Sequence, residues 1–316
     1  MLSVWLKSIA QRYLDVRLRA GRDFDTRILE RPGCWMPAAE LDTLSAELRE
    51  VASRTLPAGS LTYGVFSGDR TRLAHSIVTV VYRRSDRRPV AFNAMAAMAL
   101  EVDGRPEEVL HLGLVMVDPD VRSQGLSWVL YGLSCFLLLV RKQMRPLWVS
   151  NVTQVPAIVG MVAETFSDVF PGPHPGARRR FVQLLAARQI MAGHRHVFGV
   201  GADAVFDEQR FVITNAYTGG SDALKKTFDE AQKHRKPAYN DFCARELDYA
   251  RGDDVLQLGR MDLEAAVRYL RHSVPRAAWA QVLLSAGVLV VQRLALPVLH
   301  WFDSDREWGR LRPWNR

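Results

Sequence analysis

The chain has 316 residues, of which 48% are hydrophobic and 24% are charged. These values are typical of globular proteins and exclude disordered, collagen-like and coiled-coil chains, while the length allows one large domain or two ordinary ones. The net charge is +8, and only six of the 42 basic residues are lysines. This charge favours an anionic partner, which could be nucleic acid, a membrane surface or a phosphorylated cofactor, and of these we do not expect nucleic acid. The alternative is a solvated, arginine-rich surface.

The cysteine and histidine patterns exclude two other classes. Cys34, Cys135 and Cys243 lie far apart without a CxxC spacing, which excludes a disulfide framework and a cysteine-based zinc site. We interpret Cys243 as a small buried residue rather than a nucleophile. His194 and His196 have no acidic or cysteine partner at a matching interval, so we expect no metal. A reducing, cytoplasmic location fits best.

The first segment, residues 1–58, is predicted to be helical. In residues 1–21, Leu6, Ile9 and Tyr13 alternate with basic residues at helical spacing, which predicts an amphipathic helix and no secretory signal. Residues 37–54 carry leucines three and four apart and predict a second helix. We expect both helices to dock on the rest of the protein.

From Ser60 onward the pattern changes to alternating strands and helices. Residues 75–83, 89–101 and 109–117 are predicted to be strands, and a turn at 102–106 makes the last two an antiparallel hairpin. An apolar helix over 128–142, a strand over 146–151 and a helix over 155–166 follow.

The loop over residues 118–127 joins a predicted strand to the apolar helix. A helix N-terminus has unpaired N–H groups and a partial positive charge, so a turn containing Gly125 at this place suits a pyrophosphate. Arg122 adds a mobile cation. Taken alone, a glycine before a helix is also ordinary structural punctuation.

Residues 115–127, with the element order around them, resemble the GNAT superfamily of acyl-CoA N-acyltransferases over about residues 60–170. We therefore predict a mixed α/β fold with a GNAT-like acyl-CoA-binding domain over 59–218, a helical extension over 219–275 and an apolar C-terminal helix with a basic tail over 276–316. The resemblance implies acetyl-CoA or a longer acyl-CoA as cosubstrate. The residues that it assigns to the cofactor are Val115, Met116, Val117, Arg122, Ser123, Gln124, Gly125, Leu126, Ser127 and Asn151.

The resemblance also implies a mechanism. The strand over 112–117 is expected to splay from the strand over 147–151, with pantetheine between them. An amine acceptor of unknown identity then attacks the thioester in a ternary complex, and strand N–H groups stabilise the oxyanion.

The proton-transfer residues follow less directly from the resemblance. His111 shares a strand face with Val115 and Val117 by alternation and is the first candidate base, with Glu101 as the second. A histidine bonded to backbone and an exposed turn carboxylate are the respective alternatives. Met161 stands where the family has its tyrosine acid, so either another group or water protonates the leaving thiolate, or the acetyltransferase chemistry is altered or lost.

Two other functions remain open at this point. One is an N-acyl amino acid synthase that uses an acyl carrier protein, because an acidic carrier suits the basic chain. The other is a catalytically silent GNAT-like module that binds a membrane or forms oligomers. Arg178, Arg179 and Arg180 are either a solvated face or contacts to the 3′-phosphate of the cofactor.

The C-terminal third combines charged segments with one apolar segment. Residues 210–215 predict a strand with a hairpin partner within 197–206, and 223–236 and 262–271 predict helices. Residues 277–302 are mostly apolar, with Trp279 and Trp301 near the ends. This segment is a helix docked on the protein or on a second copy, an interfacial membrane helix, or a span; the protein is then cytoplasmic or peripheral to the membrane.

Overall fold

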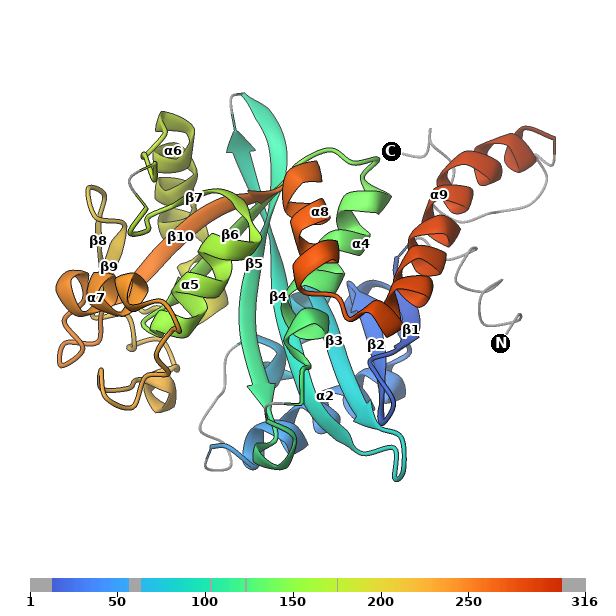
Figure 1. The fold of residues 1–316 in the computed structure, drawn as a ribbon, viewed down its shortest axis with the longest axis horizontal. Helices are drawn as coiled ribbons and strands as arrows, with labels where there is room; N and C mark the ends of the chain where they lie inside the picture. Colours follow the sequence, from blue (N-terminus) through green and yellow to red (C-terminus); the bar gives the residue numbers. More distant parts are fainter. Residues whose placement is uncertain (1–12, 57–63, 103, 123, 175, 303–316) are drawn as a thin grey trace.

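The computed structural model describes residues 13–56, 64–102, 104–122, 124–174 and 176–302 (Figure 1). They form a mixed α/β fold around one large, open sheet with the order β1-β2-β3-β4-β5-β6-β10-β9-β8, and β7 also pairs with β10. The neighbours are antiparallel except for β5 and β6, which are parallel. The strands are β1 (Asp15–Arg19), β2 (Phe24–Glu30), β3 (Ser76–Arg83), β4 (Pro89–Val102), β5 (Arg105–Val117), β6 (Leu147–Thr153), β7 (Ser167–Phe170), β8 (Val205–Asp207), β9 (Val212–Thr214) and β10 (Asp254–Met261).

Helices cover both faces of this sheet (Figure 1). One face packs against the helices α4, α8 and α9, and the other packs against α2 and α6. A π-helical stretch, Trp128–Leu133, runs directly into α4. The helices are α2 (Ala38–Ser53), α3 (Arg70–Leu73), α4 (Ser134–Arg141), α5 (Pro156–Thr165), α6 (Phe181–Gln189), α7 (Pro237–Glu246), α8 (Leu263–His272) and α9 (Trp279–Phe302).

The middle of the chain follows the sequence prediction. The three predicted strands are β3, β4 and β5, and β4 and β5 form the expected antiparallel hairpin. The predicted strand over 146–151 is β6, the helix over 155–166 is α5, and the helix over 37–54 is α2. Leu41, Leu44 and Leu48 bury the apolar side of α2.

The N-terminal prediction is wrong where the structure describes it. Residues 15–19 form β1, an edge strand antiparallel to β2, rather than the end of an amphipathic helix. Val16 and Leu18 are buried while Arg17 and Arg19 are exposed, which is the period of two that a half-buried strand requires. Residues 1–12 lie outside the described part of the chain.

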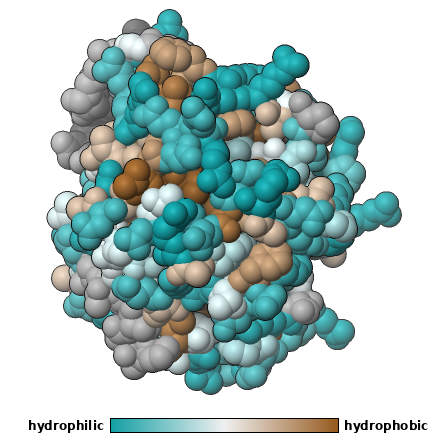
Figure 2. Space-filling model, turned by 90° about the vertical axis from the view of Figure 1, so that its left-hand side faces the viewer, coloured by the Kyte–Doolittle hydropathy of each residue, from teal (hydrophilic) through white to brown (hydrophobic). Residues whose placement is uncertain are grey.

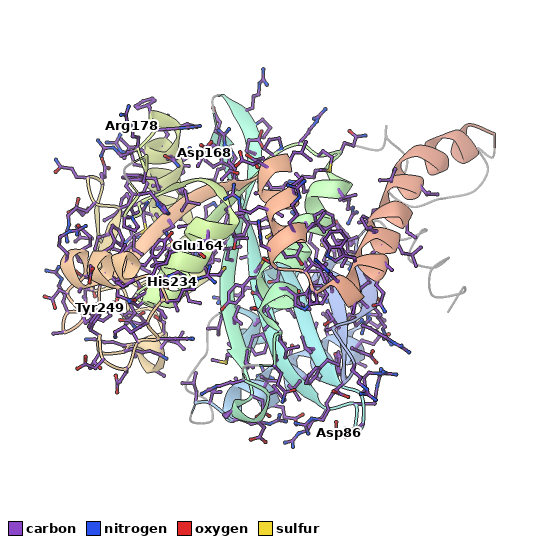
Figure 3. The ribbon with its side chains drawn as sticks, in the orientation of Figure 1. Asp86, Glu164, Asp168, Arg178, His234 and Tyr249 are labelled. Carbon is purple, nitrogen blue, oxygen red and sulfur yellow. The ribbon has the colours of Figure 1, made fainter. Side chains whose placement is uncertain are left out.

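The predicted helix over 223–236 is also absent from the structure. Apart from the short 3₁₀ turn Asp222–Leu224, this segment is irregular up to α7. Glu164 of α5 holds its end through ion pairs with Arg235 at 2.8 Å and Lys236 at 2.7 Å, beside His234 (Figure 3). Long-range ion pairs thus replace the local helix that the charged composition predicts.

The sequence prediction omits β10, although this strand lies in the interior of the sheet. Seven residues of β10 pair with β6, and its other edge pairs with β9 and β7. The segment 219–275 is therefore not only helical. Seen from the side of β8, β9 and α7, the surface is mainly hydrophilic with hydrophobic patches near its centre (Figure 2).

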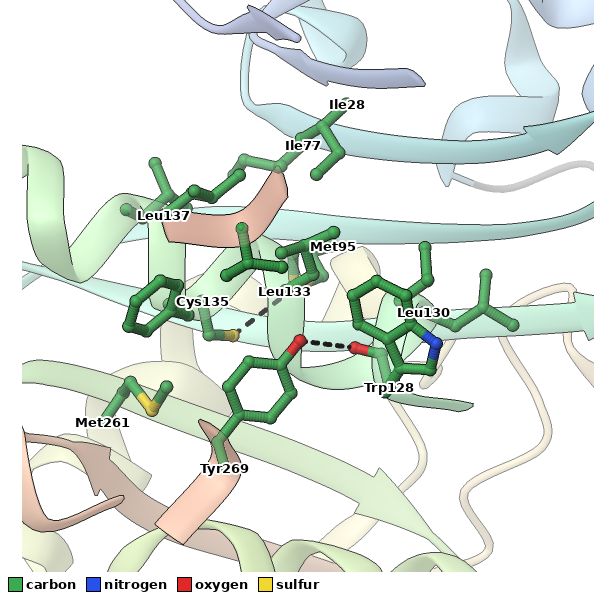
Figure 4. Close-up of a cluster of buried hydrophobic side chains, with 14 of the residues drawn as sticks. Ile28, Ile77, Met95, Trp128, Leu130, Leu133, Cys135, Leu137, Met261 and Tyr269 are labelled. Carbon is green, nitrogen blue, oxygen red and sulfur yellow. Dashed lines mark hydrogen bonds between the residues drawn. The ribbon is translucent and has the colours of Figure 1, made fainter. Parts of the chain in front are cut away.

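The largest core cluster fixes the helix that follows the predicted cofactor loop. The Tyr269 hydroxyl of α8 donates to the Trp128 carbonyl at 2.9 Å (Figure 4). A side chain at Gly132 would meet the Tyr269 ring at 2.1 Å, so only glycine allows this close packing. The start of the π-helical stretch is thereby held in place.

The helix α9 docks by one side only. Its buried residues Val282, Ser285 and Leu289 face α4 and β1, and the Arg19 N–H donates to Gln281 Oε1 at 2.9 Å. Leu283, Leu284, Val290 and Val291 are exposed. No single helix among the described residues has the length and apolarity to cross a membrane. The pair Leu263–His272 and Arg276–Val291, bent by 116°, meets these criteria only when taken together.

Candidate functional site

An opening in the sheet lies between β5 and β6. These strands pair in parallel over Val109, Leu110 and His111 only, whereas β5 continues beside β4 as far as Val117. Along a strand the N–H groups point alternately to the two sides. Beyond His111, those on the β6 side of β5 therefore face the opening without a strand partner.

A β-bulge at Gly113 accompanies this opening. The register between β4 and β5 shifts there by one residue, and Gly113 has a left-handed φ of +63°. An added Cβ at Gly113 would lie 1.8 Å from the Ala94 carbonyl oxygen. The bulge therefore requires glycine both for its backbone conformation and for its close approach to β4.

The bulge overturns the predicted face of His111. Simple alternation puts His111 with Val115 and Val117, but the extra residue reverses the alternation after Gly113. Val115 and Val117 pack with the cluster on the α4 side, whereas His111 lies beside Phe198 on the other face. The candidate base and these cofactor residues thus come from opposite faces of the sheet.

A cavity of about 940 Å³ occupies the opening and reaches residues of both faces. Its walls include β5, β6, the first residue of β10 and the segment that follows α6. Of the predicted cofactor residues, those at the cavity are Val115, Met116, Val117, Arg122 and Asn151. The Asn151 amide is buried and donates to Gln257 Oε1 at 3.2 Å.

Arg122 is the residue of the predicted phosphate loop, 118–127, that borders this cavity among those the structure describes. Gly125 has a φ of +72°, with open space where a Cβ would stand. Its N–H and that of Leu126 have no acceptor among the described residues. Leu126 is buried, Gln124 donates to the Asp120 carbonyl at 3.3 Å, and Ser127 is exposed; Ser123 lies outside the described residues.

His111 is buried and neutral. Its Nδ1 lies 3.1 Å from the Ser150 hydroxyl, and its ring centroid is 4.9 Å from that of Phe198. Burial lowers the pKa of His111 to about 4. The ring borders the cavity, but it is a weak base at neutral pH.

The structure places the other sequence candidates away from the cavity. Glu101 is exposed, and its backbone pairs with the Gln189 side chain of α6. Arg180 is paired with Asp168 at 2.7 Å, and Arg179 donates to the Glu208 carbonyl at 2.7 Å. Cys243 is buried, and burial raises the pKa of its thiol to about 12.

His194 and His196 both border the cavity, with ring centroids 6.5 Å apart. His194 Nε2 lies 3.0 Å from the Ala99 carbonyl oxygen. Within the described ranges, no three histidine, cysteine or acidic side chains are grouped as a metal ion needs.

Sequence reasoning missed several polar residues at the cavity, and three of them bear on its chemistry. Tyr131 comes from the π-helical stretch, Tyr217 from the loop after β9 and Asp254 from the first position of β10. Tyr217 donates to Asp254 Oδ1 at 2.9 Å. Burial raises the pKa of Asp254 to about 7. The sequence signal for the Asp254 site is the pair Asp253-Asp254 before an apolar stretch. Such a pair is equally typical of a solvated turn.

Comparisons with known proteins give no family for this chain. No protein-family model matches it. No curated protein matches it at a significant level either. The geometry of the cavity therefore carries the functional argument.

Proposed function

We propose that the protein is an N-acyltransferase that moves an acyl group from acyl-CoA to an amine by direct transfer. The observation that carries this proposal is the opening between β5 and β6, because β5 ends its pairing with β6 at His111 while β4 still supports it. A strand whose N–H groups border a cavity without a strand partner in the described part of the chain suits an extended amide-bearing chain such as pantetheine.

The two ends of acyl-CoA need different surroundings. The N–H groups of Gly125 and Leu126, which have no acceptor among the described residues, suit the pyrophosphate together with Arg122 beside the cavity. The free N–H groups of β5 suit the oxyanion that forms when the amine attacks the thioester.

The leaving thiolate also requires a partner. Met161 provides no hydroxyl and packs against the core. Tyr131 borders the cavity and holds its proton, because burial raises the pKa of its hydroxyl. We assign Tyr131 to the hydrogen bond that stabilises the thiolate, in place of the tyrosine expected at position 161.

The cofactor loop gives the direct test. Gly125→Glu adds bulk and a negative charge where the pyrophosphate would lie, so we expect the affinity for acetyl-CoA to fall at least about 100-fold in calorimetry. Gly104→Glu is the matched control, since Gly104 has a φ of +71° and open space at its Cβ but lies in the β4–β5 turn. Equal affinity in the two variants would contradict the proposal.

The exposed side of α9 favours a second candidate, a silent module that binds a membrane or a second copy. Leu283 and Leu284 are 54% and 61% exposed on a helix whose other side is docked. Release of free thiol from acetyl-CoA in the presence of primary alkylamines separates the candidates, because a silent module binds without turnover. Repeating the assay with an acylated carrier protein tests the carrier-dependent alternative.

A further inference from the structure

Asp254 is a buried carboxylate with no cationic partner among the residues that the structure describes. Its residue is 5% exposed, and its only hydrogen-bond donor among the described side chains is the Tyr217 hydroxyl on Oδ1. Its Oδ2 has no partner in the described part of the chain, and the residue borders the cavity. Burying an uncompensated carboxylate is unfavourable, so such a group requires an explanation.

The preceding residue, Asp253, is a buried carboxylate whose charge is neutralised by an arginine. Asp253 is fully buried, and Arg251 donates to both of its oxygens at 2.7 and 2.6 Å. Asp253 does not border the cavity, whereas Asp254 does. Arg251 thus neutralises Asp253, and Asp254 at the cavity has no cationic partner among the described residues.

We propose that Asp254 binds the acceptor as an aliphatic primary ammonium ion and takes the proton that its nitrogen must lose before attack. This inference rests on the proposed acyl transfer and names the acceptor class and the proton acceptor for it. Tyr217 holds one oxygen of the carboxylate, which leaves the other oxygen able to accept from a donor in the cavity. An ammonium group supplies both the donor and the charge that the cavity lacks at this point.

The step balances without a further reactant. Asp254 takes one proton from the ammonium group, and the freed nitrogen lone pair forms a bond to the thioester carbonyl carbon. The C–S bond then breaks, and its electron pair leaves on the coenzyme A sulfur, which is protonated from solvent after release. The second proton of the nitrogen passes to solvent as the amide forms, and Asp254 releases its own proton to solvent before the next turnover.

The groups around Asp254 determine the direction of its titration. Burial raises its pKa most, the Tyr217 hydrogen bond lowers it, and the neighbouring Asp253 raises it. Tyr249, which precedes β10, also lies within electrostatic range of Asp254. His111, Lys226 and Glu230 are other titratable groups along the same cavity. The carboxylate form therefore accumulates around pH 7, where an alkylamine is still protonated.

The test uses full-length protein, acetyl-CoA and a series of primary alkylamines, with thiol release measured across pH. We expect wild-type kcat/KM to rise with pH through an inflection near 7. Asp254→Asn should lower kcat by about 10²- to 10⁴-fold and remove the inflection, with unchanged affinity for acetyl-CoA. Tyr217→Phe should move the inflection to higher pH, because it removes the hydrogen bond that favours the carboxylate.

Asp253→Asn is the matched control, since it removes an adjacent buried carboxylate outside the cavity, and it should keep an inflection. An inflection near 4 in the wild type would assign the proton to His111 instead. Unchanged turnover in Asp254→Asn would overturn the inference while leaving the acyl transfer intact. Absence of acetyl-CoA binding in the wild type would instead overturn the proposed function itself.

Discussion

The two edges of β5 differ, although they belong to one strand. Towards β4 the strand is paired from Arg105 to Val117, and towards β6 it is paired over three residues only. The bulge at Gly113 marks the place where the second pairing has ended. One added residue in a strand thus reverses its faces beside a cavity that a regular sheet would have closed.

Gly113→Ala should disrupt the bulge in β5 and have the largest effect on stability. The Cβ would overlap the Ala94 carbonyl at 1.8 Å in a left-handed conformation, so we expect a loss of more than about 3 kcal/mol in the free energy of unfolding. Gly104→Ala is the control with nearly the same φ and no neighbour within 4 Å, and it should cost about 1 kcal/mol. Urea denaturation measures both, and similar losses would mean that the bulge does not depend on Gly113.

Local pattern explains why one wall of the cavity was predicted and the other was not. The elements β3, β4, β5 and β6 each show their period within a few residues. The other wall depends on distant partners, since Val255 of β10 pairs with Thr153, about a hundred residues earlier. The sequence around Asp254 does not indicate that Arg251 pairs with Asp253 rather than with Asp254.

The position of His111 shows a subtler limit. The sequence places this residue correctly on β5 and beside the opening. Its face depends on the bulge, and a single glycine in a strand does not reveal whether the alternation continues or reverses. The N-terminal error has the opposite cause, because residues 15–19 satisfy a helical spacing loosely and a strand alternation well.

His111 and Asp254, two buried groups on the cavity walls, should make the stability of the protein depend on pH in opposite directions. The pKa of His111 is lowered from 6.5 to about 4, so its contribution is present above pH 6.5 and is lost as the pH falls towards 4. The pKa of Asp254 is raised from 3.8 to about 7, so its contribution is present at low pH and is lost as the pH rises towards 7. The two slopes oppose each other between about pH 4 and 6.5.

A variant that removes one of the two groups should therefore leave the pH dependence of stability that the other group causes. Relative to wild type, His111→Gln should become less stable as the pH rises from 4 to 6.5, by about 1.4 kcal/mol per pH unit. Asp254→Asn should show the reverse slope over the same range. Urea denaturation at several pH values measures both. Parallel curves for the wild type and the two variants would mean that neither group is held away from its ordinary pKa.

The smallest expected effect on stability concerns the two sides of α9, which differ as the two edges of β5 do. Val282 and Leu289 are buried against the protein, while Leu283 and Leu284 are mostly exposed. Replacing both exposed leucines with serine should change the free energy of unfolding by less than about 0.5 kcal/mol. Val282→Ser, on the docked side, should cost clearly more and provides the matched control.

The same pair of variants tests what the exposed side contacts. Arg271, His272 and Arg276 precede α9, so an apolar side flanked by basic residues should bind anionic vesicles more strongly than neutral ones. We expect the double serine variant to float less with vesicles that contain phosphatidylglycerol, and high salt to weaken flotation of the wild type. Absence of flotation in the wild type, together with a smaller particle for the double variant in light scattering, would instead show that this side joins two copies of the chain. Because the docked side of α9 is unchanged in the double variant, a loss of flotation or a smaller particle reports a lost contact of the exposed side and not a loss of folding.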